Sequence, residues 1–185
     1  MPREMSFIYW VRRCRKLISS FQILIEMRDV KAYKHEGKEN PLRKWYRYRN
    51  PLRVVFNFLI IYTCRYLPSI GLKNFLYRLI GVRVGKNVSV GLGAVFDIFF
   101  PELIQIGDNS VVGHNATILT HEFLVDEIRK GEVRIGKNVL IGTKALILPG
   151  VKIGDNAKIS AYSLVNKNIP ENSFVGGIPA KKIGK

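Results

Sequence analysis

Residues 135–170 read IGKNVL, IGTKAL, ILPGVK, IGDNAK, ISAYSL and VNKNIP, which are six consecutive units of six residues. The first position of every unit is apolar and never shifts: Ile135, Ile141, Ile147, Ile153, Ile159 and Val165. A period of six fits neither the 3.6-residue turn of an α-helix nor the two-residue alternation of a strand. It is the pattern of a β-helix solenoid, in which each unit supplies one short strand and one turn. The pattern therefore predicts a mainly β protein built as a parallel β-helix.

The same repeat extends toward the N-terminus with two interruptions. Hexapeptides occupy residues 84–95 and again 106–123, where the last unit reads ILTHEF. Three units form one triangular coil of 18 residues, and counting 18 from Ile118 reaches position 136, one past the inward Ile135. We therefore expect residues 124–132 to leave the coil as an extruded loop. The domain boundaries follow: an extension over 1–81, then a β-helix over 82–185 that ends in a C-terminal cap.

The turns between units have a composition of their own. Gly follows the inward residue in many units, and Asn often stands two positions later. Both residue types tolerate backbone conformations that other residues avoid. Small residues fill the fifth position, where a tight corner leaves little room: Ala94, Ser110, Ala116, Ala145, Ala157 and Ser163. Stacked Ile and Val then bury one continuous core.

The charge is high and unevenly distributed. The 185 residues carry 30 Lys and Arg against 14 Asp and Glu, a net charge of +16. Residues 1–80 hold 17 of these basic residues and 5 of the acidic ones, which is +12, whereas residues 81–185 hold 13 and 9, which is +4. The basic N-terminal part predicts an anionic partner, such as a membrane surface, a lipid-linked phosphate or nucleic acid. A solvated basic face without a partner is the alternative.

The extension is expected to be largely helical. Apolar residues spaced three and four apart from Phe7 to Ile25 predict an amphipathic helix, and residues 52–80 look helical again. Its apolar face can pack within the protein or its oligomer, or it can lie on a membrane. Residues 54–64 are the most apolar stretch, but a bilayer requires about 20 residues. Peripheral membrane contact through residues 1–66 and a cytoplasmic location, without a secretory signal, are the expectations.

Residues 31–51 mix aromatic and basic side chains without a motif. They could lie at a lipid headgroup layer or stack on nucleic acid. Nucleic-acid binding is the weaker expectation.

Three histidines are candidates for chemistry. His35 falls in the polar linker, and His114 falls at an outward turn position of its unit. His121 stands at the fourth position of ILTHEF, where the predicted loop begins, and Glu122 follows it. A rigid scaffold can hold such an imidazole while a loop shapes a pocket, so His121 is the catalytic candidate. His114 and His121 occupy non-equivalent positions, so no metal site is expected.

At this point the sequence resembles a known family. The repeats, the ILTHE run and the tail IGDNAKISAYSLVNKNIPENSFVGGIPAKKI resemble the hexapeptide-repeat acyltransferases, especially the maltose and galactoside O-acetyltransferase branch. The resemblance covers residues 82–185, whereas 1–81 match only loosely. It implies a left-handed parallel β-helix and a homotrimer with active sites between subunits. It also implies transfer of an acetyl group from acetyl-CoA to a sugar hydroxyl of a glycan or polysaccharide precursor.

The resemblance also assigns site residues. It implies that His121 is the general base and that the oxyanion is stabilised by backbone N–H groups at Gly142 and Thr143. The coenzyme contacts that it implies fall on Thr143, Ala161, Asn166, Lys167 and Lys181. The family often has threonine where this chain has Asn166.

The acceptor region departs further from the family. The segment AVFDIFFPE replaces the family's asparagine-rich acceptor strand. Asp97 and Glu122 are the polar candidates there, either to orient His121 or to hold a sugar hydroxyl, and Asp97 could equally be an outward turn residue.

Two other functions remain open from sequence. One is N-acylation of an amino sugar on a nucleotide carrier. The other is a non-catalytic trimeric scaffold with a membrane-binding N-terminus, because a fold alone does not prove activity.

Overall fold

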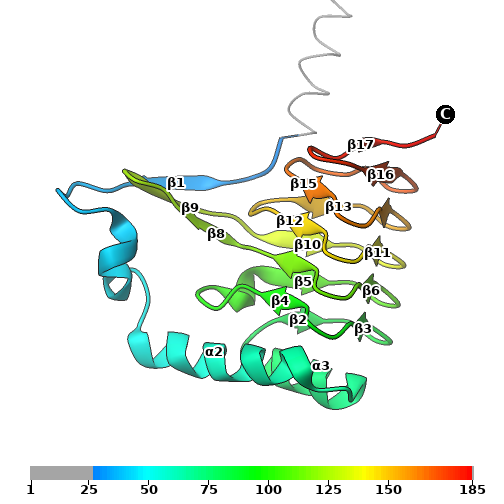
Figure 1. Ribbon diagram of the computed structural model, residues 1–185, viewed down its shortest axis with the longest axis horizontal. Helices are drawn as coiled ribbons and strands as arrows, with labels where there is room; N and C mark the ends of the chain where they lie inside the picture. Colours follow the sequence, from blue (N-terminus) through cyan, green and yellow to red (C-terminus); the bar gives the residue numbers. More distant parts are fainter. Residues whose placement is uncertain (1–26, 185) are drawn as a thin grey trace, which may run out of the picture.

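The computed structural model describes residues 27–184, which form a stack of coils capped at one end by two helices (Figure 1). The helix predicted over residues 7–25 lies outside the described residues. Helices α2 (Pro51–Tyr66) and α3 (Ile70–Leu79) lie across the end of the stack that carries the first coil, and the C-terminus lies at the opposite end (Figure 1).

Three sheets form the faces of the solenoid. The first face contains β2 (Arg83–Val84), β5 (Ile104–Ile106), β10 (Val133–Ile135) and β13 (Lys152–Ile153). The second face contains β3 (Ser89–Val90), β6 (Val111–Val112), β11 (Leu140–Ile141), β14 (Lys158–Ile159), β16 (Phe174–Gly176) and β17 (Lys181–Lys182). The third face contains β4 (Val95–Phe96), β7 (Thr117–Ile118), β12 (Leu146–Ile147) and β15 (Leu164–Val165). Neighbouring strands are parallel except β17, which turns back antiparallel on β16.

The register confirms the predicted 18-residue coil and locates its interruptions. Inward partners Ile147 and Val165 are 18 residues apart, but Phe96 and Ile118 are 22 apart, and Ile118 and Ile147 are 29 apart. Compared with a regular coil of 18 residues, the segment from Phe96 to Ile118 is four residues longer and the segment from Ile118 to Ile147 is eleven residues longer. Both gains fall in the turn that leads from the third face to the first, which we call the third corner. The turn from the second face to the third is the second corner.

Inward-facing Ile and Val form one core that runs the length of the stack. The small fifth-position residues are buried as predicted: Ala94, Ser110, Ala116, Ala145, Ala157 and Ser163. Burial of this apolar surface, at about 25 cal/mol per Å², is the main stabilising term of the solenoid.

The asparagines of the turns adopt positive φ, as the sequence predicted. Asn138 has φ 55°, and its side chain bonds to the asparagines of the coils on either side: Asn109 at 2.8 Å and Asn156 at 3.1 Å. The glycines that follow the inward residues have a different reason. Gly142 is not among the positive-φ residues, but a Cβ there would lie 2.5 Å from the backbone nitrogen of Ala161 on the next coil. Close stacking, not backbone freedom, requires glycine at that position.

The helical cap presents polar groups to the first coil. Buried Lys73 donates from Nζ to the carbonyls of Val90 and Gly91 at 2.9 and 3.3 Å, and Asn74 donates to the carbonyl of Val88 at 2.7 Å. These carbonyls belong to the terminal coil, which has no further coil to bond to, and unpaired buried carbonyls are costly. The cap therefore closes the open end of the solenoid.

The predicted loop is a β-hairpin extended by a third strand. Strands β8 (His121–Phe123) and β9 (Glu127–Lys130) pair antiparallel, and β1 (Lys31–Lys34) pairs antiparallel with β9 on its other edge. A 3₁₀ helix, η1 (Pro41–Arg47), follows β1, and a second one, η2 (Pro101–Leu103), lies within the four-residue gain. The N-terminal extension is therefore partly built into the hairpin (Figure 1).

Candidate active site

His121 and Asp97 meet at the third corner, where both gains in chain length occur. Asp97 directly follows β4, and His121 opens β8 shortly after β7 on the adjacent coil. The parallel pairing of Phe96 with Ile118 brings these two turns together. Nδ1 of His121 lies 2.5 Å from Oδ2 of Asp97. The structure thus joins two of the three predicted catalytic residues.

Asp97 is held from all sides by hydrogen-bond donors. Its side chain is 0% exposed. Oδ1 accepts from the backbone N–H of Phe99 and Phe100, and Oδ2 accepts from the backbone N–H of Thr120 and His121 as well as from the imidazole. An outward turn position, the alternative that the sequence left open, is therefore wrong for Asp97.

These contacts fix the charge of Asp97. Burial alone raises the pKa of a carboxyl, yet the hydrogen bond and charge of His121, with the backbone N–H groups of Thr120 and Phe100, hold the pKa of Asp97 below its usual range. The ionised carboxylate is an acceptor for a proton on Nδ1 of His121. A neutral imidazole oriented in this way has Nε2 as its unprotonated acceptor, which is what a general base needs.

An aromatic cluster surrounds the imidazole, whose side chain is 13% exposed. Ring centroids of Phe99, Phe123 and Phe100 lie 4.7, 5.0 and 5.8 Å from that of His121. Trp45 and Tyr48, from η1 and its C-cap, pack on Phe99 and Phe123 at 5.7 and 6.2 Å. The basic, aromatic segment that suggested lipid or nucleic-acid contact from sequence thus also covers the catalytic candidate.

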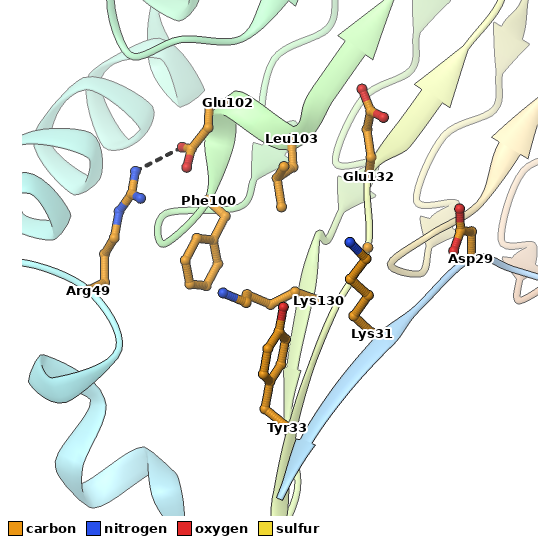
Figure 2. Close-up of a pocket in the computed structure, with 10 residues that line it drawn as sticks. Asp29, Lys31, Tyr33, Arg49, Phe100, Glu102, Leu103, Lys130 and Glu132 are labelled. Atoms are coloured by element: carbon orange, nitrogen blue, oxygen red, sulfur yellow. Dashed lines mark hydrogen bonds and ion pairs between the residues drawn. The ribbon is translucent and has the colours of Figure 1, made fainter.

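A cavity of about 430 Å³ opens beside this cluster (Figure 2). Phe100 separates it from His121, and Lys130, which pairs directly opposite His121 in the hairpin, places its ammonium 4.7 Å from the Phe100 ring. Lys31 and Tyr33 of β1 line the same cavity. Sequence reasoning missed it because four distant segments build it: β1, the segment of Arg49 after η1, the turn after β4, and β9.

The charges of this cavity are only partly balanced. Glu102 pairs with Arg49 at 2.9 Å, Glu132 pairs with Arg83 and Arg134 outside the cavity, and Asp29 lies 3.6 Å from Lys152. Among residues 27–184, Lys31 and Lys130 have no carboxylate within ion-pair distance. The lining holds three carboxylates and three basic groups, and each carboxylate has a basic partner, so Lys31 and Lys130 are the lining charges outside these ion pairs.

Glu122 is not part of the His121–Asp97 pair. Successive residues of a strand point to opposite faces, so Glu122 lies on the face of β8 away from His121. Its carboxylate pairs with Arg28 at 2.8 Å, just before β1. This ion pair links the N-terminal extension to the β8–β9 hairpin.

Most residues implied for coenzyme binding fall into two groups, one at each corner of the third face, and Lys181 lies apart from both. Gly142 and Thr143 stack on Ala161 at the second corner, whereas Asn166 and Lys167 follow β15 at the third corner. Lys181 belongs to β17 in the C-terminal cap. The N–H of Gly142 already donates to the carbonyl of Ile159 at 2.9 Å, which leaves the N–H of Thr143 as the oxyanion donor of the implied pair.

The other two histidines take structural contacts. His114 hydrogen-bonds to Asn115 at 2.8 Å in an exposed turn, as its predicted outward position implies. A place in the polar linker predicts a surface position for His35, but His35 is half-buried, and its Nδ1 lies 2.6 Å from the hydroxyl of Tyr48. Within the described part of the chain, no group of three or more His, Cys, Asp or Glu residues could hold a metal ion.

Comparison with known proteins gives the class of this fold and site. Residues 132–167 match the family model "Bacterial transferase hexapeptide (six repeats)", and residues 81–120 match "Hexapeptide repeat of succinyl-transferase". The chain is 49% identical over 142 residues to the "Putative acetyltransferase YvoF" of Bacillus subtilis, which covers 75% of this chain and 83% of YvoF. The galactoside O-acetyltransferase of Escherichia coli is 38% identical over 110 residues, 54% of each chain.

Solved structures share the fold. A hexapeptide-repeat acetyltransferase of Vibrio cholerae in complex with acetyl-CoA gives a TM-score of 0.62 at 20% identity, over 72% of this chain and 87% of that one. A galactoside acetyltransferase in complex with coenzyme A gives 0.61 at 24% identity, over 84% and 86%.

The chain belongs to the hexapeptide-repeat acyltransferase family. It has that family's left-handed β-helix fold, and the prediction of an acyltransferase that uses acetyl-CoA is confirmed at the level of the family.

Proposed function

We propose that this protein transfers the acetyl group of acetyl-CoA to a sugar hydroxyl of a glycan or polysaccharide precursor, with His121 as general base. The observation that carries the proposal is the 2.5 Å contact between Nδ1 of His121 and the buried carboxylate of Asp97. That contact fixes the ring and its tautomer, and it stabilises the imidazolium that forms during transfer.

The proposed step balances without a covalent enzyme intermediate. Nε2 of His121 takes the proton of the acceptor hydroxyl as its oxygen forms a bond to the thioester carbonyl carbon. The N–H of Thr143 stabilises the resulting oxyanion, a contribution worth about 10²–10³-fold in rate where such a donor has been removed. The C–S bond then breaks, and the departing CoA thiolate receives the proton from the imidazolium.

The distribution of these groups supports a shared active site. His121 lies at the third corner and Thr143 at the second, so the strands of the third face separate them within one chain. A neighbouring protomer could bring its second corner to the first protomer's third corner. This arrangement agrees with the homotrimer that the family resemblance implies, with one site at each subunit contact.

The second corner has a further feature that supports coenzyme binding there. Lys144 and Tyr162 have φ of 57° and 56°, although neither is the Gly or Asn that tolerates such values. Positive φ in other residues costs roughly 1–2 kcal/mol and is concentrated at functional sites. We propose that CoA lies along this corner, against Thr143 and Ala161, with Lys167 and Lys181 near its phosphates.

We place the body of the acceptor sugar in the cavity beside Phe100, from which its reacting hydroxyl would extend past the Phe100 ring to Nε2 of His121. Tyr33 and Phe100 offer apolar ring surfaces, and the lining carboxylates and ammonium groups can hydrogen-bond sugar hydroxyls. Glu122, turned toward Arg28, supports this region from behind by fixing the extension to the hairpin.

We also propose peripheral contact of the basic N-terminal part with an anionic membrane at its cytoplasmic face, where a lipid-linked acceptor would lie. None of the helices in residues 27–184 is long and apolar enough to cross a membrane.

The test is CoA release from acetyl-CoA by the full chain, against neutral sugars, acidic sugars, amino sugars, nucleotide sugars and lipid-linked glycans. His121→Ala should lower turnover by about 10²–10⁴-fold while CoA still binds, and His114→Ala should retain most of it. Loss in His114→Ala but not in His121→Ala would overturn the assigned base. Transfer to amino groups alone would favour N-acylation, and absence of both turnover and CoA binding would favour a scaffold.

A further inference from the structure

The two cap helices bury three polar side chains among apolar ones and expose many apolar side chains on their outer side. The buried positions of α3 include Lys73 and Asn74, and those of α2 include Asn57. All three reach carbonyls of the first coil and its following turn. A helix that covers a soluble core normally turns its charged side outward.

The outward side of the cap is apolar. We call it the cap face; its side chains are all large, and each is 40–80% exposed: Leu52, Val55, Phe56, Phe58, Leu59, Tyr62, Tyr66, Ile70, Leu72, Phe75 and Leu79. Single exposed apolar residues are common on proteins, but a contiguous group of this kind marks an interaction surface. The two helices that carry it lie across the end of the stack (Figure 1).

The charged residues of the cap and the first coil are all basic. Residues 40–96 contain ten Lys and Arg and no Asp or Glu, although Lys73 is buried and Arg49 and Arg83 pair with Glu102 and Glu132 from later segments. Arg65 lies beside Tyr66 with its guanidinium 5.8 Å from the ring, and Arg78, Arg83 and Lys86 are exposed near the junction with the first coil. Aromatic, aliphatic and basic side chains without acidic ones are the composition of a surface that lies at an anionic bilayer.

We infer that the cap face is the surface by which this protein docks on an anionic lipid bilayer, with its aromatic and aliphatic side chains in the headgroup region. The inference names the contact surface of the membrane association proposed above, and it does not depend on the acetyl transfer. A second copy of the chain is a less favourable partner for the cap face. Two apposed cap faces would bring together two sets of basic residues, and residues 40–96 contribute no carboxylate to offset them.

The location agrees with peripheral docking. The cap lies at the end of the solenoid opposite the C-terminus, so the membrane would lie against the helices that cover the first coil, and His121 lies on the second coil, close to that side. A sugar carried on a lipid would then meet the active site near the membrane surface.

The experiment is cosedimentation of the full chain with two kinds of vesicle. One contains phosphatidylcholine alone, and the other also contains about 30% of the anionic lipid phosphatidylglycerol. The test variant carries Leu59→Ser and Phe75→Ser, which are 55% and 60% exposed. The matched control carries Val125→Ser and Ile178→Ser, which are 83% and 75% exposed but lie on the hairpin and the C-terminal cap. CoA release is measured on all three proteins.

We expect wild type and control to bind the anionic vesicles, more weakly as salt is raised, and the test variant to bind at least tenfold more weakly with unchanged CoA release. Equal binding by the test variant, or no vesicle binding by the wild type, would overturn the inference. A dimer of the protein that persists at high salt, and that only the substitutions of the test variant dissociate, would also overturn the inference. A second copy of the chain would then occupy the cap face. If none of the three proteins releases CoA, the proposed acetyl transfer is contradicted. Vesicle binding by the same proteins still tests the docking surface, because the two measurements are independent.

Discussion

Replacing Asp97 by asparagine tests the core of the proposed site with one change of atom. The carboxylate accepts five hydrogen bonds, four from backbone N–H groups and one from Nδ1 of His121. The asparagine keeps one acceptor oxygen and turns an NH₂ group toward donors. Hydrogen bonds to a charged group contribute about 1.5–3 kcal/mol each, and the asparagine loses at least two of the five. We therefore expect the free energy of unfolding to fall by about 3–5 kcal/mol.

That loss has two readouts. At roughly 2–4 °C per kcal/mol for a chain of this size, Tm should fall by about 6–20 °C in a calorimetric or fluorescence melt. Because Nδ1 of His121 would lose the acceptor that fixes its tautomer, kcat for CoA release should fall by about 10²–10⁴-fold, measured at a temperature where the variant is folded. CoA affinity should change little, since the proposed coenzyme contacts lie elsewhere.

The control is Asp155→Asn. Asp155 also accepts a backbone N–H, from Lys137 at 2.8 Å, but it is exposed and far from the third corner. It should lower Tm by only a few degrees and leave kcat unchanged. Wild-type turnover and melting in Asp97→Asn would refute the argument that this carboxylate holds His121.

Four further outcomes follow from the geometry. Asn138→Ala should destabilise the solenoid by about 2–3 kcal/mol in urea unfolding, because it loses two ladder hydrogen bonds and keeps φ near 55°; Asn138→Gly should recover about half. Gly142→Ala should cost about 1–3 kcal/mol and weaken CoA binding, because its Cβ would press on the next coil. Gly71→Ala, with open space around it, should instead stabilise by about 0.4–1 kcal/mol. Since the folded state lowers the pKa of Asp97, its contribution to stability is present above the ordinary aspartate pKa and is lost as pH falls toward the lower folded value; acid titrations should show this loss in wild type and not in Asp97→Asn.

The period of six was enough to predict the faces, the core and the interruption before Ile135. His121 was a candidate because it stands where the repeat gives way to the predicted loop. Asp97 became a candidate through the family resemblance, which left orienting His121 as one of its possible roles. Their contact depends on the 22-residue step from Phe96 to Ile118, and the four extra residues in that step break the repeat. Aligning the two coils across that gain would have found it.

The remaining features depend on contacts that a local pattern does not encode. Strand β1 is exposed at all four positions and pairs with β9 some 99 residues later, so no hydrophobic alternation marks it. The helices of the cap were predicted, but their orientation was not. Lys73 and Asn74 point inward only because the first coil presents unpaired carbonyls there.

The third corner is the one place where this solenoid varies in length. Between inward residues it spans ten positions from Phe96 to Ile106, seventeen from Ile118 to Ile135 and four from Val165 to Ile169, whereas the other two corners keep six. A chain built this way can acquire or exchange a substrate pocket by insertion at one edge without repacking its core. Grafting the 119–131 segment of a relative into this protein is therefore a direct route to hybrid enzymes with a new acceptor and an unchanged scaffold.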